Sequence, residues 1–112
     1  MKTTDALAAL SALSQESRLE AFRELVQAGK AGMPVGDLRN RIGIPATTLS
    51  AHLNILRAAN LVHDKREGRV IRVTANYPQM NSLLAYLTAN CCAGEVCEAM
   101  PCPPPRKKGD SK

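Results

Sequence analysis

The sequence predicts a mainly α-helical domain that carries one β-hairpin, and three observations support this fold class. Apolar residues recur at helical spacing along successive segments of the 112-residue chain. After Asn60 the pattern changes to short alternating or β-branched runs on either side of Gly68. Aromatic residues are few, with two Tyr, one Phe and no Trp, so the core must be built from Leu, Ala, Val and Ile. A chain of this length is expected to form one domain with a modest core.

Two helices are predicted at the N-terminus. The first covers residues 4–13, where a leucine occupies every third position: Leu7, Leu10 and Leu13. Ser14 is a suitable N-cap for the second helix, which is expected to run to about Ala28 and to end at Gly29. A loop containing Gly32 and Pro34 follows.

A short helix near residues 35–42 and a longer one over 46–59 are predicted next, joined at Gly43 and followed by Pro45, a residue favoured in a first helical turn. The longer helix has two faces. Its leucines share the face expected to point inward: Leu49, Leu53 and Leu56. Its polar residues share the outward face: Thr47, Ser50, Asn54 and Arg57. This outward face is nearly uncharged and rich in hydrogen-bonding groups of the kind that read base edges.

The stretch "LVHDKREGRVIRVTA" is predicted to form a β-hairpin with its turn at Glu67-Gly68. Its tip and flanks are basic, with Lys65, Arg66, Arg69 and Arg72. Asn76 and Pro78 are expected to open a last helix over residues 77 to about 91. From Gly94 onward the pattern is lost, so residues 1–93 are interpreted as the folded domain and 94–112 as a flexible basic tail that contains cysteines.

The order of short helix, tight turn, second helix and basic hairpin indicates a winged helix-turn-helix, α-α-α-α-β-β-α. In that fold the second helix of the pair enters the major groove and the hairpin lies against the DNA backbone or minor groove. The formal net charge of +5 and the pI near 9.3 also favour an anionic partner, with nucleic acid before a membrane surface. Double-stranded DNA is therefore the predicted partner.

The N-terminal "MKTTDALAALSALS" briefly imitates a signal peptide, but Asp5 interrupts it and its leucines follow a helical face. No apolar run approaches the roughly 18 residues that a membrane span requires. We therefore expect a cytoplasmic protein without a membrane partner. In a reducing compartment, clustered cysteines are more often ligands or reactive thiols than structural disulfides.

Three stretches resemble the ArsR/SmtB-type metalloregulatory repressors: "LSQESRLEAFRELV", "VGDLRNRIGIPATTLSAHLNILRAANLV" and "DKREGRVIRVTA". The resemblance covers roughly residues 7–90, and its most specific part runs from Leu49 through Arg69. Asn60 departs from the family, which usually has Gly there, although Asn also tolerates the left-handed conformation that ends a helix.

The resemblance implies a homodimer formed through the first and last helices, which occupies a palindromic operator as a repressor and leaves it when an inducer binds. It also implies a set of DNA-contacting residues on or beside the reading helix: Thr47, Thr48, Ser50, His52, Asn54 and Arg57. The hairpin would contribute backbone contacts from Lys65, Arg66 and Arg69. For His52, a packing or phosphate role is as compatible with its position as base reading.

The resemblance also suggests the inducer. Some arsenic sensors carry a Cys-x-Cys site at the start of the third helix. That site is absent here, because residues 33–38 read "MPVGDL" and contain no cysteine. Residues 77–90 contain no His, Asp or Glu, so a nitrogen and oxygen site of the zinc or nickel type cannot be built there. The cysteines resemble the arsenite sensors whose site follows the last helix, which implies that Cys91, Cys92 and Cys97 bind As(III) or Sb(III), with Cys102 as the alternative or accessory ligand. No cofactor is expected to be needed for DNA binding.

Other interpretations of the four thiols remain open. They can form a disulfide, act as a redox or persulfide switch, or bind Zn, Cd or Pb as four thiolates. An enzyme is not expected, because no residue resembles a general base beside a cysteine and both histidines, His52 and His63, belong to the predicted DNA-reading region.

Overall fold

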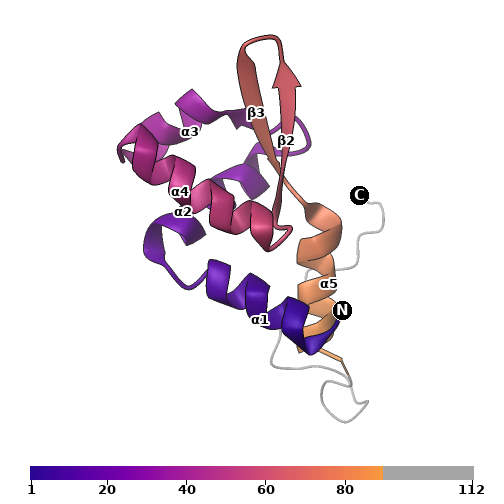
Figure 1. Ribbon diagram of the computed structural model, residues 1–112. Helices are drawn as coiled ribbons and strands as arrows, with labels where there is room; N and C mark the ends of the chain where they lie inside the picture. The colour runs from indigo at the N-terminus through magenta and orange to yellow at the C-terminus, as the bar shows by residue number, and fades with distance from the viewer. Residues whose placement is uncertain (90–112) are drawn as a thin grey trace.

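The computed structural model describes residues 1–89, which form five helices and three strands (Figure 1). In chain order these elements are α1 (Thr3–Ala12), α2 (Glu16–Ala28), β1 (Met33–Pro34), α3 (Val35–Ile42), α4 (Ala46–Ala58), β2 (Val62–Glu67), β3 (Val70–Ala75) and α5 (Tyr77–Leu87). The β2–β3 hairpin, called the wing below, projects from the end of the molecule opposite α1. The predicted winged helix-turn-helix fold is confirmed. None of the helices within residues 1–89 combines the length and apolarity needed to cross a membrane.

The helix-turn-helix pair, α3 and α4, forms as predicted. Gly43 ends α3 in the left-handed region at φ 76°, and its N–H donates to the carbonyl of Arg39 over 2.8 Å. Pro45 occupies the N-cap position of α4 rather than its first turn. The inward leucines of α4 are all buried as predicted: Leu49, Leu53 and Leu56. Their burial fixes which face of α4 remains exposed.

The start of α2 differs from the prediction. Gln15 is the N-cap, and its side-chain oxygen accepts a hydrogen bond from the N–H of Arg18. Ser14 was expected in that role, but its hydroxyl donates to the carbonyl of Ser11 over 2.7 Å and so belongs to the end of α1. The end of α2 at Gly29, where φ is 82°, is as predicted.

The wing begins after Asn60, which adopts a φ of 62° and ends α4 as the sequence indicates for a residue standing where Gly is usual. Strands β2 and β3 pair antiparallel from Val62 opposite Ala75 to Glu67 opposite Val70. The two turn residues are therefore Gly68 and Arg69, one position later than predicted. Gly68 takes the positive φ of 62° that the first residue of such a turn needs.

Strand β1 was not predicted, because two residues that include a proline give no alternating pattern. Met33 and Pro34 pair antiparallel with Val73 and Arg72, so the sheet has three strands in the order β1-β3-β2. This strand holds the base of the wing against the segment that leads into α3.

Helix α5 begins as predicted, with the Asn76 side chain accepting a hydrogen bond from the N–H of Gln79. It ends at Leu87 rather than near residue 91, and the Thr88 hydroxyl donates to the carbonyl of Leu84 over 2.8 Å. The four cysteines, the expected boundary between residues 93 and 94, and the expected tail all lie outside the described residues.

Helices α1 and α5 pack against each other, and the hydroxyls of Thr3 and Tyr86 share a hydrogen bond of 2.6 Å (Figure 1). Helix α1 turns its alanines to the core: Ala6, Ala9 and Ala12. Its leucines Leu7 and Leu10 stay 59% and 40% exposed. On α5, Leu84 and Leu87 are likewise 53% and 54% exposed. Exposed leucines are therefore present on both terminal helices.

Candidate nucleic-acid interface

The exposed face of α4 carries three small polar side chains, called the reading face below: Thr47, Ser50 and Asn54. None is charged, and all three are placed there by the burial of the leucines on the opposite side of the helix. Thr48 is also exposed, but it lies one turn before His52, on the flank of α4 beside this face. Hydroxyl and amide groups on one exposed helix face can donate to and accept from base edges.

His52 does not lie with this face. It is half-buried on the side of α4 that meets α2, where its Nδ1 atom lies 3.4 Å from Nη1 of Arg18. The Nε atom of Arg18 also donates to the carbonyl of Ala12 at the end of α1 over 2.6 Å. Arg18 therefore joins α1 to α4, a role that the sequence did not indicate.

Arg57 is half-buried at the C-terminal end of α4 and faces the wing. Its Nε atom lies 2.8 Å from Oδ2 of Asp64 on β2, in an ion pair whose N–H does not point along the contact. Its Nη1 donates to Oδ1 of Asn54 over 2.7 Å. Asp64 was not predicted as part of the site, although a carboxylate directly before Lys65 and Arg66 was a signal that could have revealed it.

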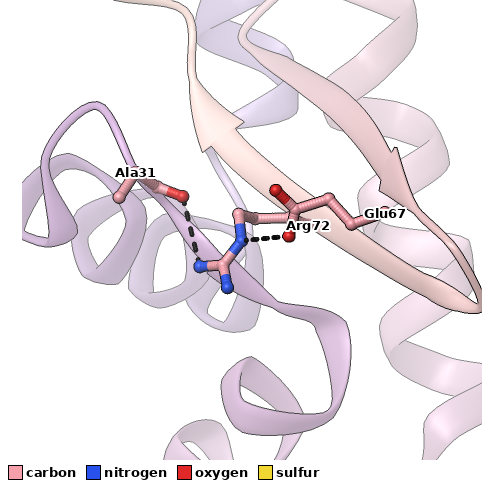
Figure 2. Close-up of polar contacts among 3 residues, drawn as sticks. All are labelled: Ala31, Glu67 and Arg72. Atoms are coloured by element: carbon pink, nitrogen blue, oxygen red, sulfur yellow. Dashed lines mark hydrogen bonds and ion pairs between the residues drawn. The ribbon is translucent and has the colours of Figure 1, made fainter.

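The basic residues of the wing fall into two groups. Lys65, Arg66 and Arg69 are exposed, and no ion pair within residues 1–89 involves them. Arg72 is half-buried instead. Its Nε donates to Oε1 of Glu67 over 3.1 Å and its Nη1 to the carbonyl of Ala31 over 3.3 Å, as Figure 2 shows. Arg72 therefore braces the wing against the loop before β1, while the first three are free to meet an anion.

A cleft of about 460 Å³ separates the reading helix from the wing. Its walls are Ser50, Leu53 and Arg57 of α4 and Arg69, Val70 and Ile71 of the wing, with Pro34, Val35 and Gly36 at the start of α3. Ser50 of the reading face and Arg69 of the wing thus border one concave surface. In residues 1–89, no three His, Cys, Asp or Glu side chains group as a metal site would require.

Comparison with known proteins gives the family. A family model described as a helix-turn-helix domain matches residues 13–64. The nodulation protein NolR of Rhizobium meliloti is 34% identical over 79 residues, which are 70% of this chain and 62% of that protein. This chain therefore spans less than two thirds of the length of that relative.

Solved structures agree. An ArsR-like transcriptional regulator from Rhodococcus sp. RHA1 is 31% identical and superposes with a TM-score of 0.66 over 75% of this chain and 76% of that one. A domain from Mycobacterium bovis, described as a homodimeric winged helix-turn-helix DNA-binding domain, is 24% identical, with a TM-score of 0.64 over 78% of this chain and 80% of its own, and supports the fold alone. With the order of its elements, its reading helix and its wing, this chain belongs to the ArsR family of winged helix-turn-helix transcriptional regulators, which are not enzymes.

Proposed function

We propose that this protein is a dimeric repressor that binds a palindromic DNA operator through α4 and the wing. The observation that carries this proposal is the uncharged reading face of α4 next to a wing with exposed cations, with Ser50 and Arg69 lining the cleft between the two elements. In this arrangement the reading face meets base edges in the major groove, while Lys65, Arg66 and Arg69 contact phosphates. Base contacts then supply specificity and phosphate contacts supply position and much of the affinity.

A second copy of the chain is proposed to bury the exposed leucines of α1 and α5. Leu7 and Leu10 are exposed on α1 and Leu84 and Leu87 on α5, and Leu84 also lines an apolar hollow of about 430 Å³ between α2 and α5. The homodimeric relative from Mycobacterium bovis makes this assembly reasonable. A two-fold dimer would set its two α4 helices at half-sites about 34 Å apart.

The proposed inducer is As(III) or Sb(III), held by Cys91, Cys92 and Cys97, with Cys102 as the alternative third ligand. Trivalent arsenic is a soft ion that takes three thiolates, and soft ligands select soft ions. Residues 77–90 of the sequence contain no His, Asp or Glu, so the thiols that follow them are the proposed ligands.

Binding of the ion is proposed to act on the dimer. Neighbouring residues of an α-helix project about 100° apart, so three sulfurs cannot converge on one ion while residues 91–97 are helical. The bound ion would fix a non-helical turn, made easier by Gly94, immediately after the helix that helps to form the dimer. A shift of that helix would change the spacing of the two reading helices and lower affinity for the operator.

The first test is operator binding. We expect the protein to select a palindromic site from random duplexes and to protect it from cleavage on two successive major grooves. Thr47→Ala and Ser50→Ala are expected to weaken binding to the selected site more than to random DNA. Equal loss on both DNAs would contradict base reading by α4.

The second test measures release of the operator by candidate inducers. Arsenite, antimonite, Cd²⁺, Zn²⁺ and peroxide are titrated against the protein–operator complex, with Cys91→Ser, Cys92→Ser, Cys97→Ser and Cys102→Ser in parallel. We expect release by arsenite and antimonite, lost in Cys91→Ser and Cys92→Ser. Release by peroxide alone would identify a redox or persulfide sensor, and release by Cd²⁺ or Zn²⁺ alone a four-thiolate sensor. Retained release by arsenite in both variants would show that the site is elsewhere.

A further inference from the structure

Arg57 connects the reading helix to the wing. It stands in the last turn of α4, while its partner Asp64 lies on β2, the strand that starts just after α4 ends (Figure 1). The two are 2.8 Å apart, and the Arg57 Nε atom is buried although the side chain as a whole is 30% exposed. A partly buried ion pair between two elements restricts how the elements can turn relative to each other.

The same guanidinium also acts on the reading face. Its Nη1 donates to Oδ1 of Asn54, one turn earlier on α4. With Oδ1 engaged, the amide nitrogen of Asn54 is the group left free, and it is a donor with two hydrogens. Arg57 therefore sets both the position of the wing and the orientation of a reading-face amide.

We propose that Arg57 is a positioning residue, which locks the wing to the reading helix through Asp64 and orients Asn54 as a hydrogen-bond donor to the DNA. The proposal rests on the proposed DNA-binding function and specifies how its two contacting surfaces are held in register. It also gives Arg57 an indirect role, whereas its charge alone would suggest a phosphate contact.

The position of Asp64 supports this proposal. A carboxylate next to Lys65 and Arg66 on a strand that faces DNA repels phosphates and weakens binding, unless it makes a contact that DNA binding needs. Its ion pair with Arg57 is such a contact. Lys65, Arg66 and Arg69 have no ion-pair partner in the described part of the chain, so on this side of the molecule the wing offers three cations to phosphates that are not engaged as Arg57 is.

The decisive variant is Asp64→Asn, because operator affinity should fall if Asp64 has the proposed structural role and rise if it has none. Removing one negative charge from a DNA-binding surface should tighten binding if Asp64 has no structural role. Loss of the lock should weaken operator binding instead, by roughly threefold to tenfold, since each dimer loses the contact twice. Asp37→Asn is the matched control: Asp37 is exposed on α3 of the same helix-turn-helix unit and has no ion pair within residues 1–89. We expect it to bind the operator as tightly as the parent or more tightly.

Variants at Arg57 separate positioning from phosphate contact. Arg57→Lys keeps the charge but cannot reach two partners with one planar group, so it should lose affinity as Asp64→Asn does. The dependence of log affinity on log salt concentration should stay unchanged in Arg57→Met, whereas loss of a phosphate contact would lower its slope by about one per site. The double variant Asp64→Asn/Arg57→Lys should bind little worse than either single variant, because both remove the same contact. Tighter binding by Asp64→Asn, or a lower salt slope in Arg57→Met, would overturn the proposal.

A measurement without DNA tests the lock independently of the proposed function. Backbone ¹⁵N relaxation of the free protein should report greater mobility at Arg66–Val70 in Asp64→Asn than in the parent and in Asp37→Asn. Equal mobility in all three proteins would overturn the positioning role. Failure of the parent protein to bind any duplex, with the mobility difference present, would instead overturn the proposed function and leave the lock established.

Discussion

The Nη1 atom of Arg18 lies 3.4 Å from Nδ1 of His52, and the same guanidinium donates through Nε to the carbonyl of Ala12 over 2.6 Å. A guanidinium only donates hydrogen bonds, so Arg18 is the donor in this contact and Nδ1 of His52 the acceptor. One half-buried side chain of α2 thus ties the end of α1, on the proposed dimer side, to the proposed DNA-reading helix.

Arg18→Met is expected to lower the free energy of unfolding by about 1–2 kcal/mol, because it leaves the Ala12 carbonyl without its charged donor and removes the contact with His52. Urea denaturation at one fixed protein concentration measures the change. Arg23→Met is the control, since Arg23 is exposed on the same helix and makes no hydrogen bond or ion pair recorded within residues 1–89. Equal stability of the two variants would show that Arg18 is not a structural bridge.

Gly32→Ala is expected to destabilise the fold by more than about 2 kcal/mol, because an added Cβ meets backbone at a position with positive φ. At a φ of 63°, an added Cβ would lie 2.0 Å from the carbonyl oxygen of Val73. The clash would push β1 away from β3 and loosen the base of the wing.

Gly36→Ala provides the matched comparison to Gly32→Ala. Gly36 is helical, and a Cβ there meets nothing within 4 Å. Alanine is a better helix former, so this variant should be as stable as the parent or more stable, by up to about 1 kcal/mol. Thermal unfolding followed by circular dichroism separates the two variants. A Gly32→Ala protein as stable as Gly36→Ala would contradict the tight packing of β1.

The sequence was sufficient to predict the helix-turn-helix and the wing because their signals are local. Gly43, Asn60 and Gly68 each mark a place where the chain needs a positive φ, and the leucines of α4 repeat at helical spacing. Strand β1 depends instead on pairing with residues some forty positions later, which a two-residue segment cannot signal. The end of α5 at Leu87 was missed because Thr88 and Ala89 give no signal in the sequence that a helix stops.

The candidate site was predicted less completely than the fold, because residue type does not reveal a partner. The sequence alone does not distinguish Arg57 and Arg72 from Arg66 and Arg69. In the structure the first two pair with carboxylates and the last two are exposed. His52 has the spacing of a residue near the reading face, but the side chain is taken up by Arg18 from another helix. Such pairings join distant segments, so they emerge only when the chain is folded.

The difference between the two kinds of wing arginine is itself testable. Arg69→Gln should weaken operator binding and lower the salt slope by about one per protomer, with stability unchanged, because Arg69 is exposed at the turn and is proposed to contact a phosphate. Arg72→Gln should lower the free energy of unfolding by about 0.5–1.5 kcal/mol, because it loses its contacts with Glu67 and Ala31. Fluorescence anisotropy across a salt series and urea denaturation give the two quantities. Equal changes of salt slope and of stability in Arg69→Gln and Arg72→Gln would contradict the division of the wing arginines into exposed and structural residues.

The exposed leucines of the terminal helices give the last prediction. Leu7→Lys and Leu84→Lys should each raise the dimer dissociation constant at least tenfold, because each dimer loses two apolar side chains worth about 1.5–3 kcal/mol apiece when fully buried. The fold of one chain should survive, since these side chains are already 59% and 53% exposed within it. Ile55→Lys is the control: Ile55 is 43% exposed but lies on α4 rather than on a terminal helix. Sedimentation velocity measures the assembly and circular dichroism the fold. Were Leu7→Lys and Leu84→Lys to remain as dimeric as Ile55→Lys, α1 and α5 would not form the interface, and the coupling proposed between the cysteines and the operator would lose its structural route.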